Sequence, residues 1–359
     1  MKKILMSGNE AIAEGAIQAG CYFYAGYPIT PQNELIAYMA KHLPEAGRVF
    51  IQAESELAAI NMVFGAAVAG VRAMTSSSSP GISLKQEGIS YLAGAELPAV
   101  IVNIMRGGPG LGNIAPSQSD YFQATRSGGH GDYHSLVLAP CSVQEAYDMM
   151  GLAFDLADKY RNPVILLGDG MLGQMMEPVL VQSSEFRVHS KKLRTTNYEL
   201  RTKPWALTGC KGRKPNIIRS LYLKEGVLEQ LNLTLQKKYK TIQEKEQRAE
   251  SLFLDDAKII LVAYGTMARI ATAVVKRLRE RGEKIGFIRP ITLWPFPEKI
   301  FTQNLRPKIK YLVIEMSYGQ MLEDVKLALN GKASVEFFGR AGGGIPTEEE
   351  IVKKVTNSY

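Results

Sequence analysis

Short apolar stretches alternate with longer amphipathic ones through the first half of the chain. The short stretches predict buried strands at residues 22–25, 49–52, 72–75, 99–104, 135–139 and 164–167. The longer stretches, at 9–19, 35–43, 55–69 and 143–159, predict helices between most of these strands. Continuous apolar strands separated by helices are typical of a parallel sheet that is covered on both faces.

The same alternation returns near the C-terminus after a polar interval. Strands are expected at 259–263, 285–288, 311–314 and 335–338, with helices that begin near Met267, Gln320 and Thr347. We therefore expect an α/β protein with two parallel-sheet domains, residues 1–185 and 256–359, joined by a connector at 186–255. Apolar side chains recur every seven residues in the connector, at Leu221, Leu228, Leu235 and Ile242, which predicts one long helix with a narrow apolar stripe.

Composition narrows the class of protein. The chain has 359 residues, 46% of them hydrophobic and 22% charged, as expected for a globular protein of two ordinary domains. No apolar run approaches the ~20 residues that span a bilayer, and the N-terminus becomes polar too soon, at Asn9 and Glu10, for a signal peptide. A cytoplasmic protein is expected. The 3 cysteines and 4 histidines are scattered, so we expect neither a metal site nor iron–sulfur ligands in this chain.

The net charge of +8 is concentrated in the connector. Residues 187–248 contain 16 Lys or Arg against 5 Glu, a surplus of 11 that more than accounts for the whole imbalance. Nucleic acid is one partner that such a segment could bind. The segment has no recognised nucleic-acid motif and no regular interleaving of aromatic with basic residues, so a solvated connector or a surface for an acidic protein is favoured.

The run Gly-Tyr-Pro-Ile-Thr-Pro at residues 26–31 follows the first predicted strand. Thr30 is a suitable helix N-cap, and Pro31 suits the first helical position, which needs no amide donor. The run therefore predicts a rigid elbow at the carboxyl end of a strand, where open parallel sheets bind ligands. The alternative is an ordinary strand-to-helix junction with good capping residues.

Two carboxylates, Glu54 and Glu56, lie at the start of the predominantly apolar helix expected at 55–69. Both could stay in water and favour the N-terminal helix dipole, or one could be held inward to pair with a ligand. A serine run at 76–79 followed by Pro80 predicts a similar strand-to-helix turn, with Ser79 as the cap.

Arg106 follows the strand at 99–104 and opens a glycine-rich turn at 107–112. An arginine at the carboxyl end of a strand suits a carboxylate or phosphate ligand, although a surface salt bridge is the alternative. Gly-Asp-Gly at 168–170, with Asn197 downstream, resembles the magnesium and diphosphate motif of thiamine enzymes. The apolar strand expected before that asparagine is missing, so we interpret this match as coincidental.

Together and in this order, the motifs resemble those of the 2-oxoacid:ferredoxin oxidoreductases. The resemblance rests on residues 27–31, on Gln-Ala-Glu-Ser-Glu at 52–56 and on Arg106. Tyr-Gly-Thr at 264–266 and Arg-Pro-Ile-Thr-Leu-Trp-Pro-Phe-Pro at 289–297 extend it into the second domain. It covers nearly the whole chain and is nearest to the alpha-type subunit of the split, branched-chain form, which acts on 2-oxoisovalerate.

The resemblance implies a fold and a site. The first domain would have the pyrimidine-binding fold of thiamine enzymes, and the last the transketolase C-terminal-like fold. Thiamine diphosphate lies between two subunits in this family, and a glutamate shares a proton with its aminopyrimidine ring. The family register matches this glutamate to Glu56 and not to Glu54, and it matches Thr30 to substrate contact and Arg106 to the substrate carboxylate. Cofactor contacts are implied for Tyr27, Pro28, Ile29, Thr30, Glu56 and Ser79.

The resemblance also implies partners. Magnesium and the diphosphate would be held by a beta-type subunit, and [4Fe–4S] clusters by a ferredoxin-like subunit alongside a gamma-type subunit. The expected reaction is oxidative decarboxylation of a branched-chain 2-oxoacid to acyl-coenzyme A, with electrons passed to ferredoxin and no role for nucleic acid or membrane. Two alternatives stay open: another 2-oxoacid such as 2-oxoglutarate as substrate, and a catalytically silent scaffold subunit.

Overall fold

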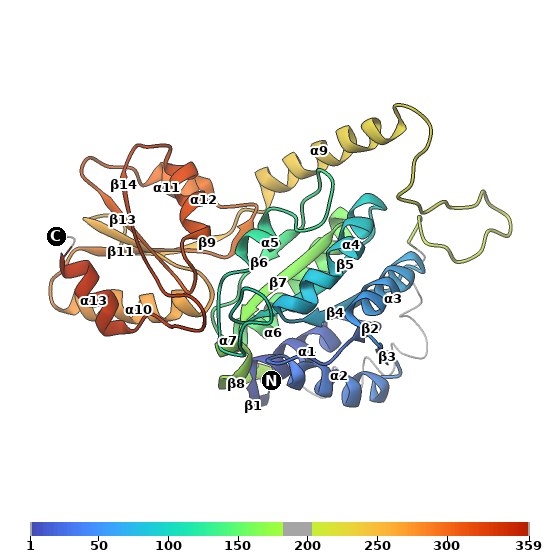
Figure 1. Ribbon diagram of the computed structural model, residues 1–359, viewed down its shortest axis with the longest axis horizontal. Helices are drawn as coiled ribbons and strands as arrows, with labels where there is room; N and C mark the ends of the chain where they lie inside the picture. Colours follow the sequence, from blue (N-terminus) through green and yellow to red (C-terminus); the bar gives the residue numbers. More distant parts are fainter. Residues whose placement is uncertain (1, 182–202, 358–359) are drawn as a thin grey trace.

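The computed structural model describes residues 2–181 and 203–357, which form two sheet-centred units side by side (Figure 1). The strands of the first sheet are β2 (Phe23–Gly26), β3 (Val49–Gln52), β4 (Ala73–Ser77), β5 (Ala99–Met105), β6 (Leu136–Leu138), β7 (Pro163–Asp169) and β12 (Thr292–Trp294). Their order across the sheet is β12-β6-β7-β5-β4-β2-β3, and every neighbouring pair is parallel except β12 with β6. A separate antiparallel pair joins β1 (Lys2–Ser7) to β8 (Met176–Val181).

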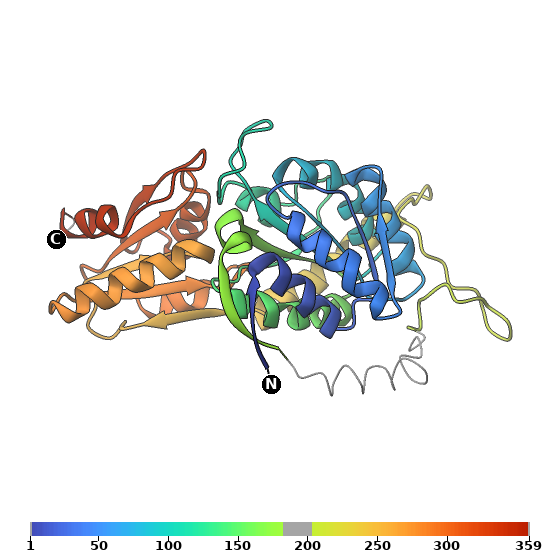
Figure 2. The same ribbon diagram turned by 90° about the horizontal axis from the view of Figure 1, so that it is seen from below.

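Helices cover both faces of the first sheet, as its apolar strands require. One face carries α1 (Gly8–Gln18), α2 (Asn33–Glu45) and α6 (Val143–Tyr160), which are well seen from below in Figure 2. The other carries α3 (Glu56–Val68), α4 (Ser79–Gly94) and the short α5 (Tyr121–Thr125). The helix α7 (Gly170–Gln174) directly follows β7. No helix in the described ranges combines the length and apolarity needed to cross a membrane.

The second unit repeats the pattern on a smaller scale. Its strands β10 (Ile259–Val262), β11 (Ile285–Pro290), β13 (Lys310–Glu315) and β14 (Ser334–Gly339) are parallel, and β9 (Ala249–Leu252) adds an antiparallel edge beside β11. The helices α10 (Gly265–Glu280) and α13 (Glu348–Asn357) pack together on one face, and α11 (Glu298–Gln303) and α12 (Gln320–Leu329) on the other (Figure 1).

The strands and long helices predicted from the pattern are present with small shifts at their ends, but β3, which was expected to be buried, is an edge strand without a buried residue. The missed strands β1, β8, β9 and β12 all make antiparallel pairs at sheet edges or in the small two-stranded sheet, so their apolar pattern is weak. Of these, β12 belongs by sequence to the second unit but pairs with β6 of the first sheet. The two units therefore share an element.

The prediction of one long connector helix was wrong at its start. The helix α9 spans Val227–Lys245, so Leu221 lies before it and is 70% exposed, and Leu228 is 49% exposed. Only Leu235 and Ile242 of the predicted stripe are buried, together with Tyr239. The ring of Tyr239 meets His134 and Trp294 edge-on, at centroid distances of 5.3 and 5.8 Å. The C-terminal half of α9 thus docks on the body, while residues 182–202, including Asn197, lie outside the described residues.

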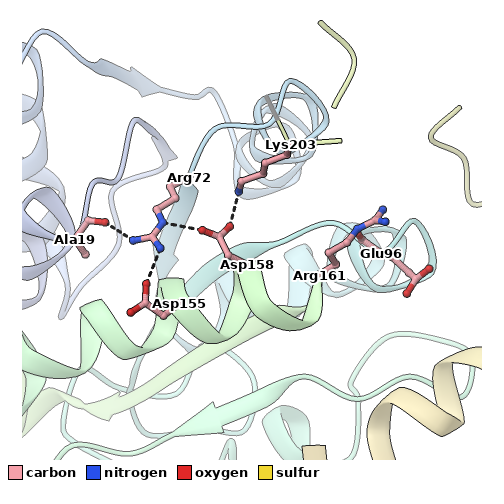
Figure 3. Close-up of polar contacts among 7 residues, drawn as sticks. All are labelled: Ala19, Arg72, Glu96, Asp155, Asp158, Arg161 and Lys203. Atoms are coloured by element: carbon pink, nitrogen blue, oxygen red, sulfur yellow. Dashed lines mark hydrogen bonds and ion pairs between the residues drawn. The ribbon is translucent and has the colours of Figure 1, made fainter. Parts of the chain in front are cut away.

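A polar cluster around Arg72 closes the amino edge of the first sheet (Figure 3). The Arg72 guanidinium donates to Asp158 at 2.9 Å, to Asp155 at 2.6 Å and to the carbonyl of Ala19 at 2.6 Å. Lys203 contacts the other oxygen of Asp158. The start of β4, the end of α1, α6 and the connector are thereby tied together at the edge opposite the predicted ligand site.

Buried polar contacts join the two units. The Gln118 side chain donates to the carbonyl of Tyr264 and accepts from the amide of Met316, both at 2.9 Å. The Asp324 carboxylate, 7% exposed, accepts from the Tyr121 hydroxyl at 2.5 Å and from Arg126 at 2.7 Å. These bonds fix the second unit against the loop that follows β5.

Asp324→Asn should lower the free energy of unfolding by about 1–3 kcal/mol, because the buried hydroxyl and the guanidinium lose a charged acceptor. The neighbouring Glu323 is exposed, so Glu323→Gln is the matched control and should change stability by less than ~0.5 kcal/mol. Denaturant unfolding of the full chain measures both. Equal effects of the two substitutions would contradict the importance of this joint.

Candidate functional site

The predicted site segments meet at the carboxyl edge of the first sheet. The strands β5, β4, β2 and β3 are consecutive neighbours, and all run in parallel. Arg106 follows β5, Ser79 follows β4, the elbow 26–31 follows β2 and Glu56 follows β3. After β2 the chain continues to β3, which lies on one side of β2 in the sheet. It continues later to β4 and β5, which lie on the other side of β2. The elbow therefore lies where the strand order reverses, the usual ligand position in such sheets.

The elbow is present, but its predicted capping was wrong. Helix α2 begins at Asn33, with Gln32 in the N-cap position, and Thr30 and Pro31 lie in a turn joined by a cis peptide bond. Gln32 is buried, and its side-chain oxygen accepts a hydrogen bond from Ser76 at 2.6 Å. This tertiary bond to β4 decides where the helix starts. The Thr30 hydroxyl instead accepts from the Asn33 side chain at 3.2 Å.

The residues of the elbow remain accessible. Tyr27 is 39% exposed, Pro28 is exposed, and Ile29 and Thr30 are half-buried. The loop thus presents a ring, two aliphatic side chains and a hydroxyl outward from the end of β2.

The two candidate glutamates have different environments. Ser55 is the N-cap of α3 and accepts from the Ala58 amide at 3.2 Å, so Glu54 precedes the helix and is exposed. Glu54 therefore lies just before α3, which starts one residue later than the helix expected at 55–69. Glu56 is the first helical residue and is only 7% exposed. Its carboxylate makes no hydrogen bond or ion pair with any residue that the structure describes, which leaves a buried acid with free acceptors.

The surroundings of Glu56 fit a polar ligand. The hydroxyls of Thr75, Ser77 and Ser78, at the end of β4, are buried and lack hydrogen-bond partners within the described residues. A Cβ atom on Gly81 would lie 2.5 Å from Glu56 Oε1 and 2.1 Å from Ser77 Oγ, so glycine leaves the space that Glu56 occupies. An unpartnered carboxylate beside the unpartnered hydroxyl of Ser77 suits the ring nitrogen of an aminopyrimidine.

Ser79 is the first residue of α4 and not its cap, which is Ser78. Its hydroxyl donates to Asp120 at 2.6 Å and accepts from the Arg106 amide at 3.0 Å. Asn103 also donates to Asp120, at 2.9 Å, and burial raises the pKa of this carboxyl against the effect of both hydrogen bonds. The role of Asp120 was not predicted, because nothing in its local sequence shows that it joins the start of α4 to β5.

Arg106 joins the elbow to the glycine-rich turn. One guanidinium nitrogen donates to the Thr30 carbonyl at 2.9 Å and another to the Leu111 carbonyl at 3.2 Å, while Nε is buried without a partner. Among the described residues Arg106 forms no ion pair, so the surface salt-bridge alternative is not what the structure shows. Its positive charge is held in place by neutral carbonyls and is available to an anion.

The second unit supports this turn. The Asn113 side chain donates to the carbonyl of Gly342 at 2.9 Å, and a Cβ atom on Gly343 would lie 2.6 Å from the Ala115 methyl group. Leu111 and Ile114, in contrast, project outward at 80% and 65% exposure. Leu57, at the start of α3, is also exposed, at 47%.

The Gly-Asp-Gly motif has a structural role here. Asp169 is buried, caps α7 by accepting from the amides of Met171 and Leu172, and accepts from the Thr266 hydroxyl at 2.9 Å. Burial raises the pKa of this carboxyl, although the hydrogen bonds oppose the rise. Within the described ranges no cluster of His, Cys, Asp and Glu could hold a metal ion.

Two family models match the chain. The model described as pyruvate flavodoxin/ferredoxin oxidoreductase, thiamine diphosphate-binding, matches residues 14–247, and the one for core domain II of pyruvate:ferredoxin oxidoreductase matches residues 257–351. The ketoisovalerate oxidoreductase subunit VorB of Methanothermobacter marburgensis is 48% identical over 98% of this chain and 96% of that protein. The 2-oxoglutarate synthase subunit KorA of the same organism is 37% identical over 99% and 98%.

Solved structures agree with this picture. A 2-oxoglutarate:ferredoxin oxidoreductase from Magnetococcus marinus superposes with a TM-score of 0.86 at 27% identity, and covers 99% of this chain. The match spans 65% of that longer chain. A split-gene transketolase superposes with a TM-score of 0.57 at 12% identity, covering 98% of this chain and 97% of the other, which shows the fold alone.

Gly81→Ala should destabilise the chain by about 1 kcal/mol or more, because its methyl group displaces both Glu56 and Ser77. Gly65, in the middle of α3, is the matched control, since a Cβ atom there meets nothing within 4 Å. Gly65→Ala should stabilise the isolated chain by roughly 0.5–1 kcal/mol. Thermal and denaturant unfolding distinguish the two, and an Ala tolerated equally at both positions would show that the space around Glu56 is not tight.

Proposed function

The chain belongs to the 2-oxoacid:ferredoxin oxidoreductase family, and on that premise we propose that it contributes the pyrimidine-side half of a thiamine diphosphate site. In this proposal the whole enzyme oxidatively decarboxylates branched-chain 2-oxoacids to acyl-coenzyme A. The observation that carries the assignment is the buried, unpartnered carboxylate of Glu56 at the strand edge that also presents Thr30 and Arg106. Thiamine diphosphate, when bound, supplies the carbon nucleophile that attacks the oxo group.

Glu56 is assigned the proton-sharing role. A carboxyl group that is mostly removed from water and free of internal hydrogen bonds can share a proton with a ring nitrogen placed at its mouth. Glu54 lies outside the helix in solvent, where it lacks the geometry for this task. Tyr27, Pro28, Ile29 and Thr30 are assigned to the wall of the same pocket.

Arg106 is assigned to the substrate carboxylate. Its guanidinium is held by two carbonyls, keeps a buried Nε–H without a partner, and stands next to Thr30. Thr30 would contact the substrate from the elbow. Ser79, whose hydroxyl is committed to Asp120 and the Arg106 amide, is assigned to holding Arg106 in place as well as to the cofactor-binding edge.

We assign the remaining parts of the site to partner subunits. VorB and KorA are both named as subunits of larger enzymes. In this chain Asp169 is occupied internally, so the magnesium and diphosphate would be held by a beta-type subunit. The iron–sulfur clusters would belong to a ferredoxin-like subunit alongside a gamma-type subunit, with ferredoxin as acceptor. The exposed apolar side chains of Leu57, Leu111 and Ile114 support contact with such a partner.

The boundaries 1–185, 186–255 and 256–359 remain our proposal for the pyrimidine-binding domain, the basic connector and the transketolase C-terminal-like domain. A cytoplasmic location is part of the same proposal. It is supported by free thiols at Cys21, Cys141 and Cys210, the last of which is exposed.

Glu56→Gln should reduce turnover of the assembled enzyme by about a hundredfold or more, the usual scale for loss of general acid–base catalysis. Gln keeps the size of the side chain but cannot give up or accept the proton. Glu54→Gln is the matched control and should have a much smaller effect. Hydrogen–deuterium exchange at the thiazolium carbon is the direct readout. Slow exchange in the Glu54 variant with normal exchange in the Glu56 variant would reverse the assignment.

Arg106→Ala should raise the Michaelis constant for the 2-oxoacid roughly ten- to a hundredfold, since a charge-assisted bond to a carboxylate contributes about 1.5–3 kcal/mol. Steady-state kinetics of the complex provide the constant, and thiamine diphosphate affinity serves as the control that should change little. An unchanged Michaelis constant would remove Arg106 from the substrate site.

2-Oxoisovalerate should be turned over faster than 2-oxoglutarate. A second substrate carboxylate would want a second cation, and Lys85, the nearest candidate on α4, is fully buried with its ammonium against the backbone of Glu56. The similarity to KorA keeps 2-oxoglutarate as the alternative substrate. A 2-oxoacid panel with a redox dye decides between them, and faster turnover of 2-oxoglutarate would overturn the preference.

A further inference from the structure

Lys85 is a buried cation at the back of the proposed site. It lies on α4, where that helix packs against α3, and none of its surface is exposed. Its Nζ atom lies 3.3 Å from the backbone carbonyl of Glu56, which is its one hydrogen bond among the described residues. Burial lowers the pKa of the Lys85 ammonium to about 8, and the charge of Glu56 opposes this lowering.

Fold stability alone does not account for a cation at this position. Burying an ammonium group is costly, and only one of its three donors has a partner within the described chain. The carbonyl that it contacts belongs to the first residue of α3, where the helix dipole is unfavourable for a positive charge. A methionine would fill the same space without either cost, so the charge points to an electrostatic role.

The charged residue that Lys85 contacts directly is Glu56, through the backbone carbonyl. The other charged groups near this edge have different partners: Glu87 on α4 is exposed and accepts from Tyr91, Asp120 is bound by Ser79 and Asn103, and Arg106 is bound by two carbonyls. No direct ion pair forms between Lys85 and Glu56, because the ammonium contacts the backbone carbonyl and not the carboxylate. The carboxylate oxygens therefore stay free of hydrogen bonds within the described residues.

We propose that Lys85 is a positioning residue for Glu56: its ammonium favours the ionised carboxylate while leaving both carboxylate oxygens available to the ligand. This inference rests on the proposed function of Glu56. In the proton-sharing step, the carboxyl O–H bond breaks, an N–H bond forms at the ring nitrogen, and the electron pair stays on the carboxylate. A cation behind the carboxylate stabilises that charge, so the proton lies toward the ring and no further reagent is required.

The test uses two neutral variants in the assembled complex. Lys85→Met removes the charge and keeps the shape, whereas Lys85→Gln removes the charge but can still donate to the Glu56 carbonyl. Isothermal calorimetry measures thiamine diphosphate affinity from pH 5 to 9, and exchange at the thiazolium carbon is followed over the same range. Glu87→Gln, a charge change on the exposed side of the same helix, is the matched control.

The acid limb is the part of each pH profile where thiamine diphosphate affinity or thiazolium exchange falls as the pH is lowered. Both neutral variants should move the midpoint of this limb to higher pH by about one unit in both profiles. The sign follows because the carboxyl group holds its proton more firmly once the neighbouring cation is removed. The Glu87→Gln profile should coincide with that of the unmodified complex. If only Lys85→Met shifts the profile and Lys85→Gln does not, the role is the hydrogen bond and the electrostatic inference is overturned.

Glu56→Gln separates this inference from the proposed function. Loss of the acid limb in the Glu56→Gln affinity profile supports Glu56 as the titrating group. If Glu56→Gln instead keeps the limb, the role proposed for Glu56 fails. If Glu56→Gln removes the limb and both Lys85 variants match the unmodified complex, only the role of Lys85 is overturned. Lys85→Gln keeps the test decisive if the Lys85→Met complex does not assemble.

Discussion

The parallel register of four neighbouring strands is the constraint on which the site depends. Gly26 pairs with Gln52, and Ser77 pairs with Asn103, so β2, β3, β4 and β5 all end at one edge of the sheet. Segments far apart in the sequence are thereby delivered to the same place: the elbow, the start of α3, the start of α4 and Arg106. A shift of register by one residue would invert the faces of a strand and disperse the group.

A layer of polar contacts lies beneath this edge and ties its segments together. Gln32 is bound to Ser76, which also shares a 2.6 Å hydrogen bond with Tyr24, and Asp120 binds both Ser79 and Asn103. The groups above this layer differ in one respect: the carboxylate of Glu56 and Nε of Arg106 have unused hydrogen-bonding capacity among the described residues. Groups whose hydrogen bonds are made within the protein hold the site in place, whereas groups with free hydrogen-bonding capacity are available to a ligand. Functional sites require both kinds of group.

Most of the fold could be predicted from the sequence because buried parallel strands are continuously apolar and their helices carry good signals. The side chain of Ser142, for example, accepts from the Glu145 amide and caps α6 at the start of the helix expected at 143–159. The predicted helix starts that proved wrong lie where contacts distant in the sequence are important. Gln32 is bound to a distant strand, and α2 starts after Thr30 and Pro31. Leu221 was placed on a helix that begins only at Val227.

The choice between Glu54 and Glu56 came from family register, and the burial of Glu56 supplies an independent reason for it. The roles of Asp120 and Lys85 depend on packing between elements, which no local pattern reveals.

We expect this chain to supply one half of a shared cofactor site through Glu56. A structure of the assembled complex with thiamine diphosphate bound is the sharpest test. The Glu56 carboxylate should lie within hydrogen-bond distance of an aminopyrimidine ring nitrogen, at about 2.7–3.0 Å. Arg106 should face the substrate position, and the partner subunit should hold the diphosphate. An aminopyrimidine ring bound away from Glu56 would show that Glu56 does not have this role, and a diphosphate held by Asp169 would show that this chain binds both ends of the cofactor.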